Sequence, residues 1–392
     1  MTHPAPAPGT PTSGRRAPEP ARSRGWVIGR IADAPVIITP SWAIAAVVLT
    51  LLFAPQVARV APYGGAQVYV VSFAFVLLLF ASVFLHEVAH ALVARALGHR
   101  VTELALTVWG GHTAYTGTTR RPRDAFWIAV VGPLTNIVLA VGFFALYRAE
   151  VGSVTVWLLC YAAAFSNAFV GFFNLVPGLP LDGGQVLESA VWAGTGSRDR
   201  GTVVAGWTGR AVAVGLVLLA LGIPVAQGRS PDLFIVLWTA LIASFLWQGA
   251  SAAVAVGRAR EQVAHLQAAS FVRPHAVVTV HATVADVAHA ASAVGAYAVL
   301  VVDDAGRPVA VVEPSTAGAV PAEALARTPV GAVAVPLPVG VVVDVALHGH
   351  ALVTTVLRAG GGAGVLPAVH EGRLVGVVMV ADVATAVRSA HR

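Results

Sequence analysis

The chain has 392 residues, of which 57% are hydrophobic and only 11% are charged. Soluble domains carry about 25% charged residues, so this composition excludes an ordinary soluble protein and predicts a membrane protein. The formal net charge is +6, but the basic residues do not alternate with aromatic side chains. A nucleic-acid-binding protein is therefore not expected.

Six apolar segments, each about 20 residues or more, are long enough to span a bilayer. They cover residues 40–60, 67–97, 124–147, 154–176, 203–225 and 232–254. Arginine clusters precede the first, third and fifth segments and follow the sixth, so all four clusters lie on one side of the membrane. The positive-inside rule makes this side cytoplasmic. The sequence thus predicts a multi-pass protein of the cell (plasma) membrane with both termini in the cytoplasm.

The N-terminal residues 1–25 are rich in Pro, Ala, Ser and Arg and have no apolar core. They are expected to form a disordered cytoplasmic tail and not a cleavable signal. The single cysteine, Cys160, lies in an apolar span. A disulfide framework and a cysteine-rich metal site are therefore both excluded.

The second span contains the sequence His86-Glu87-Val88-Ala89-His90. On a helix, residues four apart face the same way, so His86 and His90 can bind one Zn²⁺ while Glu87 stays near its water. Ionisable side chains at membrane depth are costly and are usually functional. A metal site is expected; the alternative is a buried His and Glu set paired with neighbouring helices.

A third ligand is expected after the fourth span, where the sequence reads FNLVPGLPLDGG over residues 173–184. Pro177 and Pro180 must break the helix there, and broken backbone at membrane depth is tolerated only against protein or a water-filled cavity. Asp182 can point into such a cavity, and Asn174 offers an amide donor just before the break. The alternative is a Pro-rich turn in which Asp182 caps the next helix.

A glycine-containing segment between the second and third spans reads Trp-Gly-Gly-His-Thr and is flanked by alternating residues. It predicts a hairpin that dips toward the site and offers a strand edge to an extended peptide, or, alternatively, a plain surface turn. The residues assigned to peptide binding are Gly110, Gly111, His112 and Thr113.

The third span is interrupted by Gly132-Pro133-Leu134-Thr135-Asn136. Close helix packing accounts for the glycine and the proline. Asn136 is expected to bond a neighbouring backbone group.

Beyond residue 255 the long apolar runs give way to short Val-rich and Ala-rich stretches with a period near two. Residues 294–315 and 363–387 each read as strand, turn and strand, and each follows a helix-like stretch. The pattern predicts an internal repeat of a cytoplasmic α/β module.

Taken together, these motifs resemble those of the site-2 protease family of intramembrane zinc metalloproteases (peptidase family M50), in the subgroup with C-terminal tandem CBS domains. The resemblance covers about residues 36–255 for the protease core and 272–388 for the CBS pair. It implies one Zn²⁺ per chain held by His86, His90 and Asp182. It assigns Glu87 as general base, and Asn174 as the side chain that steadies the oxyanion.

The implied fold is a polytopic α-helical membrane protein with about six transmembrane helices and a re-entrant β-hairpin, followed by a cytoplasmic α/β tandem CBS domain. The expected segments are a disordered tail over 1–25, a transmembrane metalloprotease domain over 26–255, a linker over 256–271, and CBS repeats over 272–325 and 326–388.

The implied activity is hydrolysis of peptide bonds in single-span membrane proteins near the cytoplasmic face. Substrates resembling anti-sigma factors, in regulated intramembrane proteolysis, would be typical of the family. The CBS repeats depart from the Gly-x-x-Thr-x-x-Asp pattern of nucleotide-binding members, because Met379 replaces the Thr and the first repeat begins the pattern with Ala310. These departures argue against nucleotide binding and leave a regulatory role or a homodimer through the CBS domains.

Two alternatives from other classes remain. One is a non-proteolytic, CBS-regulated membrane transporter or scaffold, since transporters also use broken helices and intramembrane ionisable residues. It would not need a Glu between the two His. The other, a soluble zinc protease tethered by apolar helices, is disfavoured because the motif itself lies within a span.

Overall fold

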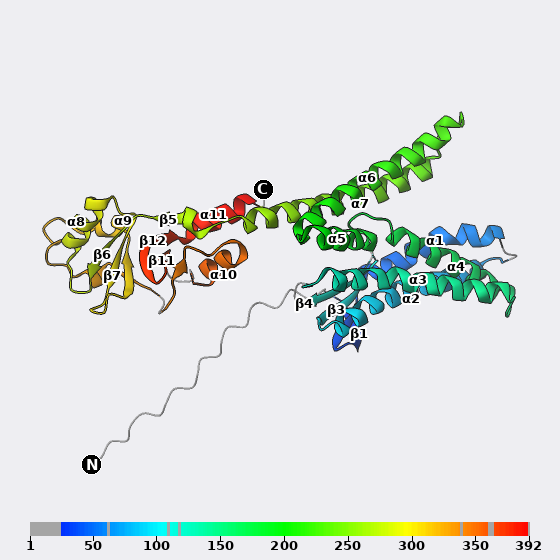
Figure 1. The fold of residues 1–392 in the computed structure, drawn as a ribbon. Helices are drawn as coiled ribbons and strands as arrows, with labels where there is room; N and C mark the ends of the chain where they lie inside the picture. The colour runs from blue at the N-terminus through cyan, green and yellow to red at the C-terminus, as the bar shows by residue number, and fades with distance from the viewer. Residues whose placement is uncertain are drawn as a thin grey trace, which may run out of the picture. The chain divides into compact units, whose positions relative to one another are not determined.

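The computed structural model describes residues 25–60, 63–107, 110–116, 119–337, 340–359 and 364–390 (Figure 1). The expected disordered tail lies outside the described residues except for Gly25. Contacts divide the chain into two compact units. The first unit contains the residues up to Val176 together with Leu181–Val186, and the second contains Pro177–Pro180 and the residues from Leu187 onward.

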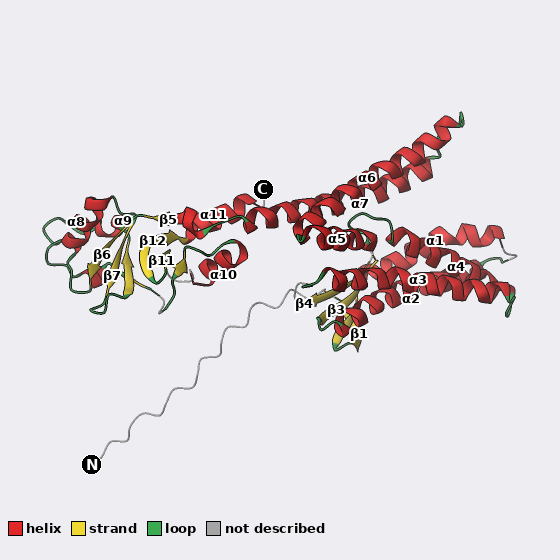
Figure 2. Cartoon of the chain, in the orientation of Figure 1, coloured by secondary structure: helices red, strands yellow, loops and turns green. Residues whose placement is uncertain are grey.

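In the part of the chain that the structure describes, six helices are long and apolar enough to cross a membrane, as the sequence predicts (Figure 2). They are α1 (Pro40–Val60), α2 (Ala66–Ala96), α3 (Pro122–Arg148), α4 (Val154–Asn174), α6 (Arg198–Ala226) and α7 (Leu233–Ala264). Each exceeds the roughly 20 residues that a bilayer requires. Large apolar side chains such as Phe165 and Leu218 are exposed on them, as lipid-facing residues would be. The predicted multi-pass membrane fold is therefore confirmed.

The first unit also contains a four-stranded sheet of β1 (Trp26–Ile31), β2 (Ala34–Ile38), β3 (Arg100–Thr107) and β4 (Gly110–Thr116), in that spatial order. Strands β3 and β4 form the predicted hairpin, and β2 runs parallel to β3. Val36 of β2 and Leu104 of β3 pack in one buried cluster with Ala91 of α2. The sheet is thus fixed against the helix that carries the His-Glu-His motif.

Helices α2, α3 and α4 contact one another within the first unit. Gly171 of α4 allows a close approach to α3, because a Cβ there would lie 3.1 Å from the carbonyl oxygen of Pro133. Small residues at such crossings are typical of membrane helices. After α4 the chain passes through Pro177 and Pro180 into α5 (Asp182–Thr195).

In the second unit, α6 and α7 pack together at glycines. A Cβ at Gly206 of α6 would lie 3.0 Å from the carbonyl oxygen of Ala250 on α7. Close to the start of α6, Arg198 Nε donates a hydrogen bond of 2.7 Å to Glu188 Oε1 of α5.

The C-terminal residues form two α/β repeats, as predicted. The first contains β6 (His275–Thr279), α8 (Val284–Val294), β7 (Ala298–Val302), β8 (Pro308–Val312) and α9 (Pro314–Ala317). The second contains β10 (Val343–Asp344), α10 (Gly349–Ala359), β11 (Val365–His370), β12 (Arg373–Met379) and α11 (Val380–Ala390). The predicted hairpin turns are present, with positive φ at Gly306 (75°) and Gly372 (77°).

Two short strands cross between the repeats when these are divided at the predicted boundary of residues 325 and 326. Strand β5 (Val272–Arg273), which precedes the first repeat, pairs with β12 of the second. Strand β9 (Val335–Pro336), which follows the first repeat, pairs with β8. The resulting sheets have the orders β10-β11-β12-β5 and β6-β7-β8-β9. Leu300, Val365 and Val377 lie in a single buried cluster shared by both sheets.

Candidate metal centre

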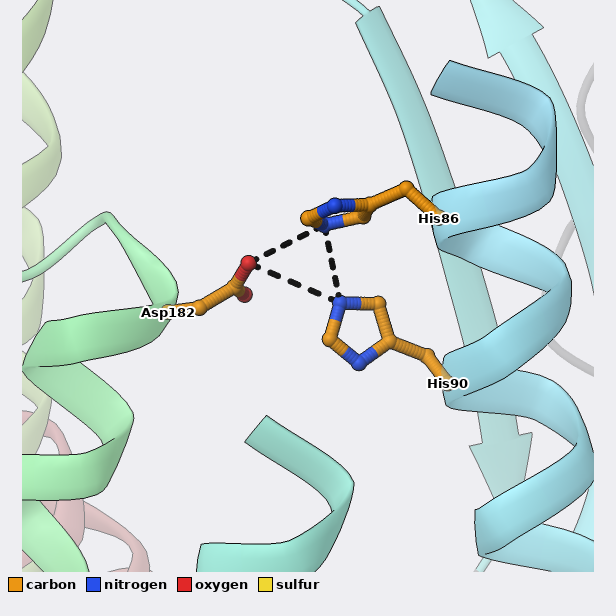
Figure 3. Close-up of side chains that lie close together, drawn as sticks. All are labelled: His86, His90 and Asp182. Atoms are coloured by element: carbon orange, nitrogen blue, oxygen red, sulfur yellow. Dashed lines mark hydrogen bonds and ion pairs between the residues drawn. The ribbon is translucent and has the colours of Figure 1, made fainter. Parts of the chain in front are cut away.

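Three side chains from two helices converge in the first unit (Figure 3). His86 and His90 lie on one face of α2, and Asp182 is the first residue of α5. Asp182 Oδ2 lies 3.0 Å from His86 Nε2 and 3.5 Å from His90 Nε2, and the two Nε2 atoms are 3.0 Å apart. The structure therefore brings together the three residues that the sequence predicts as metal ligands.

The break after α4 places Asp182. A Cβ at Gly183 would collide with the carbonyl group of Leu175, so the start of α5 folds back onto the end of α4. Gly184 N donates a hydrogen bond of 2.9 Å to the carbonyl oxygen of Leu181 and closes the turn. The Asp182 carboxylate faces His86, so it does not serve only as a helix cap.

The far nitrogen of each histidine also has a partner. His86 Nδ1 lies 2.6 Å from Asn136 Oδ1, and His90 Nδ1 lies 2.5 Å from the carbonyl oxygen of Ile128. A carbonyl oxygen only accepts, so His90 Nδ1 carries the proton and its Nε2 presents a lone pair. Metal-binding histidines usually show this arrangement, in which the outer N–H donates to an oxygen.

The donor atoms fit a zinc ion. Two imidazole nitrogens and a carboxylate oxygen form a known zinc donor set, with bonds of about 2.0–2.2 Å. Adjacent ligands of a tetrahedron with such bonds are about 3.4 Å apart, and the three atoms here are 3.0–3.5 Å apart. Three facing acceptors would repel one another unless a proton or a cation lay between them.

Glu87 lies beside this cluster but is not one of its ligands. Its side chain is buried against the hairpin, and Thr113 Oγ1 donates a hydrogen bond of 2.8 Å to its Oε2. Gly111 is needed at the same place, since a Cβ there would lie 3.0 Å from Glu87 Cδ. The hairpin therefore holds the carboxylate of the motif glutamate.

The other predicted hairpin residues do not contact Glu87 in this way. His112 Nε2 lies 3.2 Å from Glu103 Oε1. Gly110 begins β4 with a φ of 112°, a conformation that favours glycine. Of the four residues assigned to peptide binding, Gly111 and Thr113 therefore lie next to the motif glutamate.

Asn174 is the last residue of α4 and is half-buried. Within the described ranges, no hydrogen bond joins its side chain to His86, His90 or Asp182. Its assignment as an oxyanion donor stays a prediction.

Sequence reasoning missed Asn136. The expectation that it bonds a neighbouring backbone group is wrong, because its amide contacts the side chains of His86 and Asn167. A signal was available: Gly132 and Asn136 are four residues apart and thus share one face of α3. A Cβ at Gly132 would lie 2.6 Å from His86 Nε2, so this face lies directly against the histidines.

Comparison with known proteins gives three findings. Residues 74–154 and 148–219 match the family described as "Peptidase family M50". The chain is 30% identical over 256 residues to "Putative zinc metalloprotease sll0528" of Synechocystis sp.. The match covers 64% of this chain and 65% of that relative, so the chain spans slightly less than two thirds of its length.

Two solved structures show partial similarity to this chain. The site-2 protease from Methanocaldococcus jannaschii is 22% identical, with a TM-score of 0.42, over 58% of this chain and 94% of that one. The CBS domain of the bacterial CNNM/CorC family Mg²⁺ transporter is 17% identical, with a TM-score of 0.27, over 35% of this chain and 87% of that one.

Proposed function

Because the chain belongs to peptidase family M50, we propose that it is an intramembrane zinc metalloprotease that hydrolyses peptide bonds of transmembrane substrates. One observation carries the proposal: His86, His90 and Asp182 converge on an apolar helix while Glu87 lies beside them unliganded. A purely structural polar cluster would have no need of a separate carboxylate next to three converging acceptors.

His86, His90 and Asp182 would hold one Zn²⁺ per chain. When bound, the ion supplies a Lewis acid that polarises a carbonyl group and activates water. Glu87 takes a proton from the attacking water and delivers it to the leaving amine, as a general base and then a general acid. Thr113 keeps its carboxylate in place through the hydrogen bond to Oε2. Asn174 would donate to the developing oxyanion.

The substrate must be extended at the cleavage point, because a helical carbonyl group is hydrogen-bonded and shielded. Strand β4 is the last strand of its sheet order and pairs with β3 on one side. A peptide added to its other edge would run past Gly111 and Thr113, next to Glu87. Single-span membrane proteins that resemble anti-sigma factors are the proposed substrates, cleaved near the cytoplasmic face of the cell membrane.

The C-terminal repeats are proposed to be a cytoplasmic tandem CBS pair with a regulatory or dimerising role. Asp382, the acidic end of the nucleotide-binding pattern in the second repeat, is held by Arg273 at 2.9 Å. Met379 occupies the position of the missing hydroxyl. Both features argue against nucleotide binding by this repeat. The arginine clusters support cytoplasmic placement of both termini.

The test is cleavage of a panel of tagged single-span membrane proteins co-expressed with the wild type or with Glu87→Gln. Zinc is measured in both purified proteins. We expect cleavage by the wild type alone, with equal zinc content. Glu150→Gln, at an exposed position after α3, is the matched control and should cleave normally. Equal zinc without Glu87-dependent cleavage would instead favour a CBS-regulated transporter or scaffold.

A further inference from the structure

A chain of buried polar side chains runs behind His86, on the side away from Asp182. It links Ser82 of α2, Asn167 of α4 and Asn136 of α3 to His86 Nδ1. Asn136 is fully buried, and Asn167 and Ser82 are almost fully buried, with relative exposures of 1% and 4%. Burying an amide costs free energy unless its hydrogen bonds are satisfied. We therefore expect this network to have a role in the protein.

The direction of every hydrogen bond in this chain is fixed at its far end by two main-chain carbonyl groups, which can only accept. Ser82 Oγ donates its single proton to the carbonyl oxygen of Leu78, at 2.9 Å. It must therefore accept the bond from Asn167 at 2.9 Å. The same Asn167 nitrogen donates to the carbonyl oxygen of Ala163, also at 2.9 Å. The Nδ2 atom of Asn167 therefore faces Ser82 and the Ala163 carbonyl oxygen, and its Oδ1 atom faces Asn136.

The remaining bonds follow in order. Asn167 Oδ1 accepts from Asn136 Nδ2 at 2.9 Å. Asn136 must then present Oδ1 to His86 Nδ1, at 2.6 Å. An amide oxygen accepts, so the proton of the neutral imidazole lies on Nδ1. The Nε2 atom of His86, which faces Asp182, is left with a free lone pair.

We propose that Asn167 and Asn136 form an amide relay that fixes the tautomer of His86, and that both are positioning residues of the metal centre. For His90, the main-chain carbonyl oxygen of Ile128 accepts from Nδ1 and fixes the tautomer directly. At His86 Nδ1 the partner is instead the side-chain oxygen of Asn136. The two asparagines link this oxygen through hydrogen bonds to the carbonyl groups of Leu78 and Ala163, so that three helices contribute to its orientation. This inference rests on the proposed zinc site but not on proteolysis.

Asn136→Leu is the decisive variant, because it keeps the branched shape and the number of heavy side-chain atoms of Asn and removes the acceptor for His86 Nδ1–H. We expect zinc affinity, measured by chelator competition on the purified full chain, to fall about 10- to 100-fold, as for other outer partners of metal-binding histidines. Asn136→Asp still offers an oxygen to Nδ1–H but loses the donor to Asn167 Oδ1, so it should bind zinc more tightly than Asn136→Leu and less tightly than the wild type. Asn167→Leu should also fall between Asn136→Leu and the wild type, since Asn136 then keeps its acceptor but loses its anchor.

Ser166→Ala is the matched control. Ser166 adjoins Asn167 on α4 and donates to the same Ala163 carbonyl oxygen, at 3.2 Å, but has no place in the relay. It should leave zinc affinity unchanged. Melting temperatures of the chelated proteins, compared across all variants, report any general loss of packing.

Tighter binding in Asn136→Asp than in Asn136→Leu, with equal melting temperatures of the two chelated proteins, would support the relay, since a role in packing alone would lower the melting temperature of Asn136→Leu. Wild-type affinity in Asn136→Leu would overturn it, and so would equally weak binding in Asn136→Asp and Asn136→Leu. A wild-type protein without zinc would overturn the proposed metal centre and the relay with it. Loss of the Glu87 dependence of cleavage would overturn only the proposed proteolysis.

Discussion

The first unit and the C-terminal repeats use polar side chains in opposite ways. In the first unit, buried Ser, Asn and His side chains are hydrogen-bonded to one another around α2. In the repeats, the buried side chains among the described residues are Ala, Val, Leu and Pro, and the polar ones lie in caps, turns and surface ion pairs. Burial of apolar side chains stabilises the repeats. Burial of polar side chains in the membrane unit costs free energy, and such side chains usually mark a functional site.

This difference predicts that substitutions in the first unit will change metal binding and activity, and that substitutions in the repeats will change stability. The largest expected effect is that of Asp182→Ala. It removes the only carboxylate of the metal cluster and leaves two histidines as ligands. We expect zinc to fall below one equivalent per chain, and cleavage to drop at least about 100-fold. Metal analysis and the tagged-substrate assay measure both. Full zinc content would contradict the assigned ligand set.

Gly132→Ala should also abolish most zinc binding without removing any ligand. The new Cβ would lie 2.6 Å from His86 Nε2, so either α3 or the histidine must move. Gly142→Ala on the same helix is the control, because nothing lies within 4 Å of a Cβ there. Metal analysis of both variants tests the expectation, and normal zinc in Gly132→Ala would show that α3 can shift freely.

Leu352→Ala tests the other side of the comparison. Leu352 is fully buried in the core of the second repeat, and truncation of such a side chain typically costs about 2–5 kcal/mol. Leu357→Ala on the same helix, at a position that is 49% exposed, should change stability by less than about 0.5 kcal/mol. Denaturant unfolding of the repeats measures the change in the free energy of unfolding for both variants. The zinc content of both variants should equal that of the wild type.

Thr113→Val should slow cleavage while zinc binding stays intact. The variant removes the hydroxyl that donates to Glu87 Oε2 at 2.8 Å. Hydrogen bonds to charged groups contribute about 1.5–3 kcal/mol, which corresponds to a rate loss of about 10- to 100-fold. Thr113→Ser keeps the hydroxyl and should retain most of the activity. Equal rates for the two variants would show that the hairpin does not position Glu87.

The smallest expected effect is that of Thr283→Ala at the start of α8. Thr283 Oγ1 accepts a hydrogen bond from Asp286 N, and loss of such a cap costs about 1 kcal/mol. Hydrogen bonds from the Thr283 main chain and hydroxyl also hold the pKa of Asp286 below its usual value. The ionised carboxylate therefore contributes at neutral pH, and its contribution is lost as the pH falls through the lowered pKa. Urea unfolding at neutral and acidic pH should show a smaller difference between wild type and variant at acidic pH.

The features that depend on local pattern could be predicted from the sequence. The six long helices follow from apolar length, and the convergence of His86 with His90 follows from their spacing on a helix. Asp182 could be found because two prolines mark the broken helix before it. Residues 74–154 and 148–219 likewise match the peptidase family that the motifs resemble.

The features that depend on contacts between segments far apart in the sequence could not be predicted from it. Strands β1 and β2 are joined at Ala32 and Asp33, which have positive φ values of 54° and 65° but lack the Asn-Gly signal of such turns. Asn136 and Asn167 become partners only because α3 and α4 pack side by side against α2. No periodicity in one segment reveals a hydrogen bond to another.

The exchange of β5 and β9 makes the two repeats a single folding unit. A chain cut between residues 325 and 326 would separate β5 from β12 and β9 from β8. Both sheets would then have a bare edge, and the shared cluster around Leu300, Val365 and Val377 would be opened to water. The internal repeat is visible in the sequence, but each half completes its sheet with a strand from the other, so neither is expected to be a usable fragment without the other.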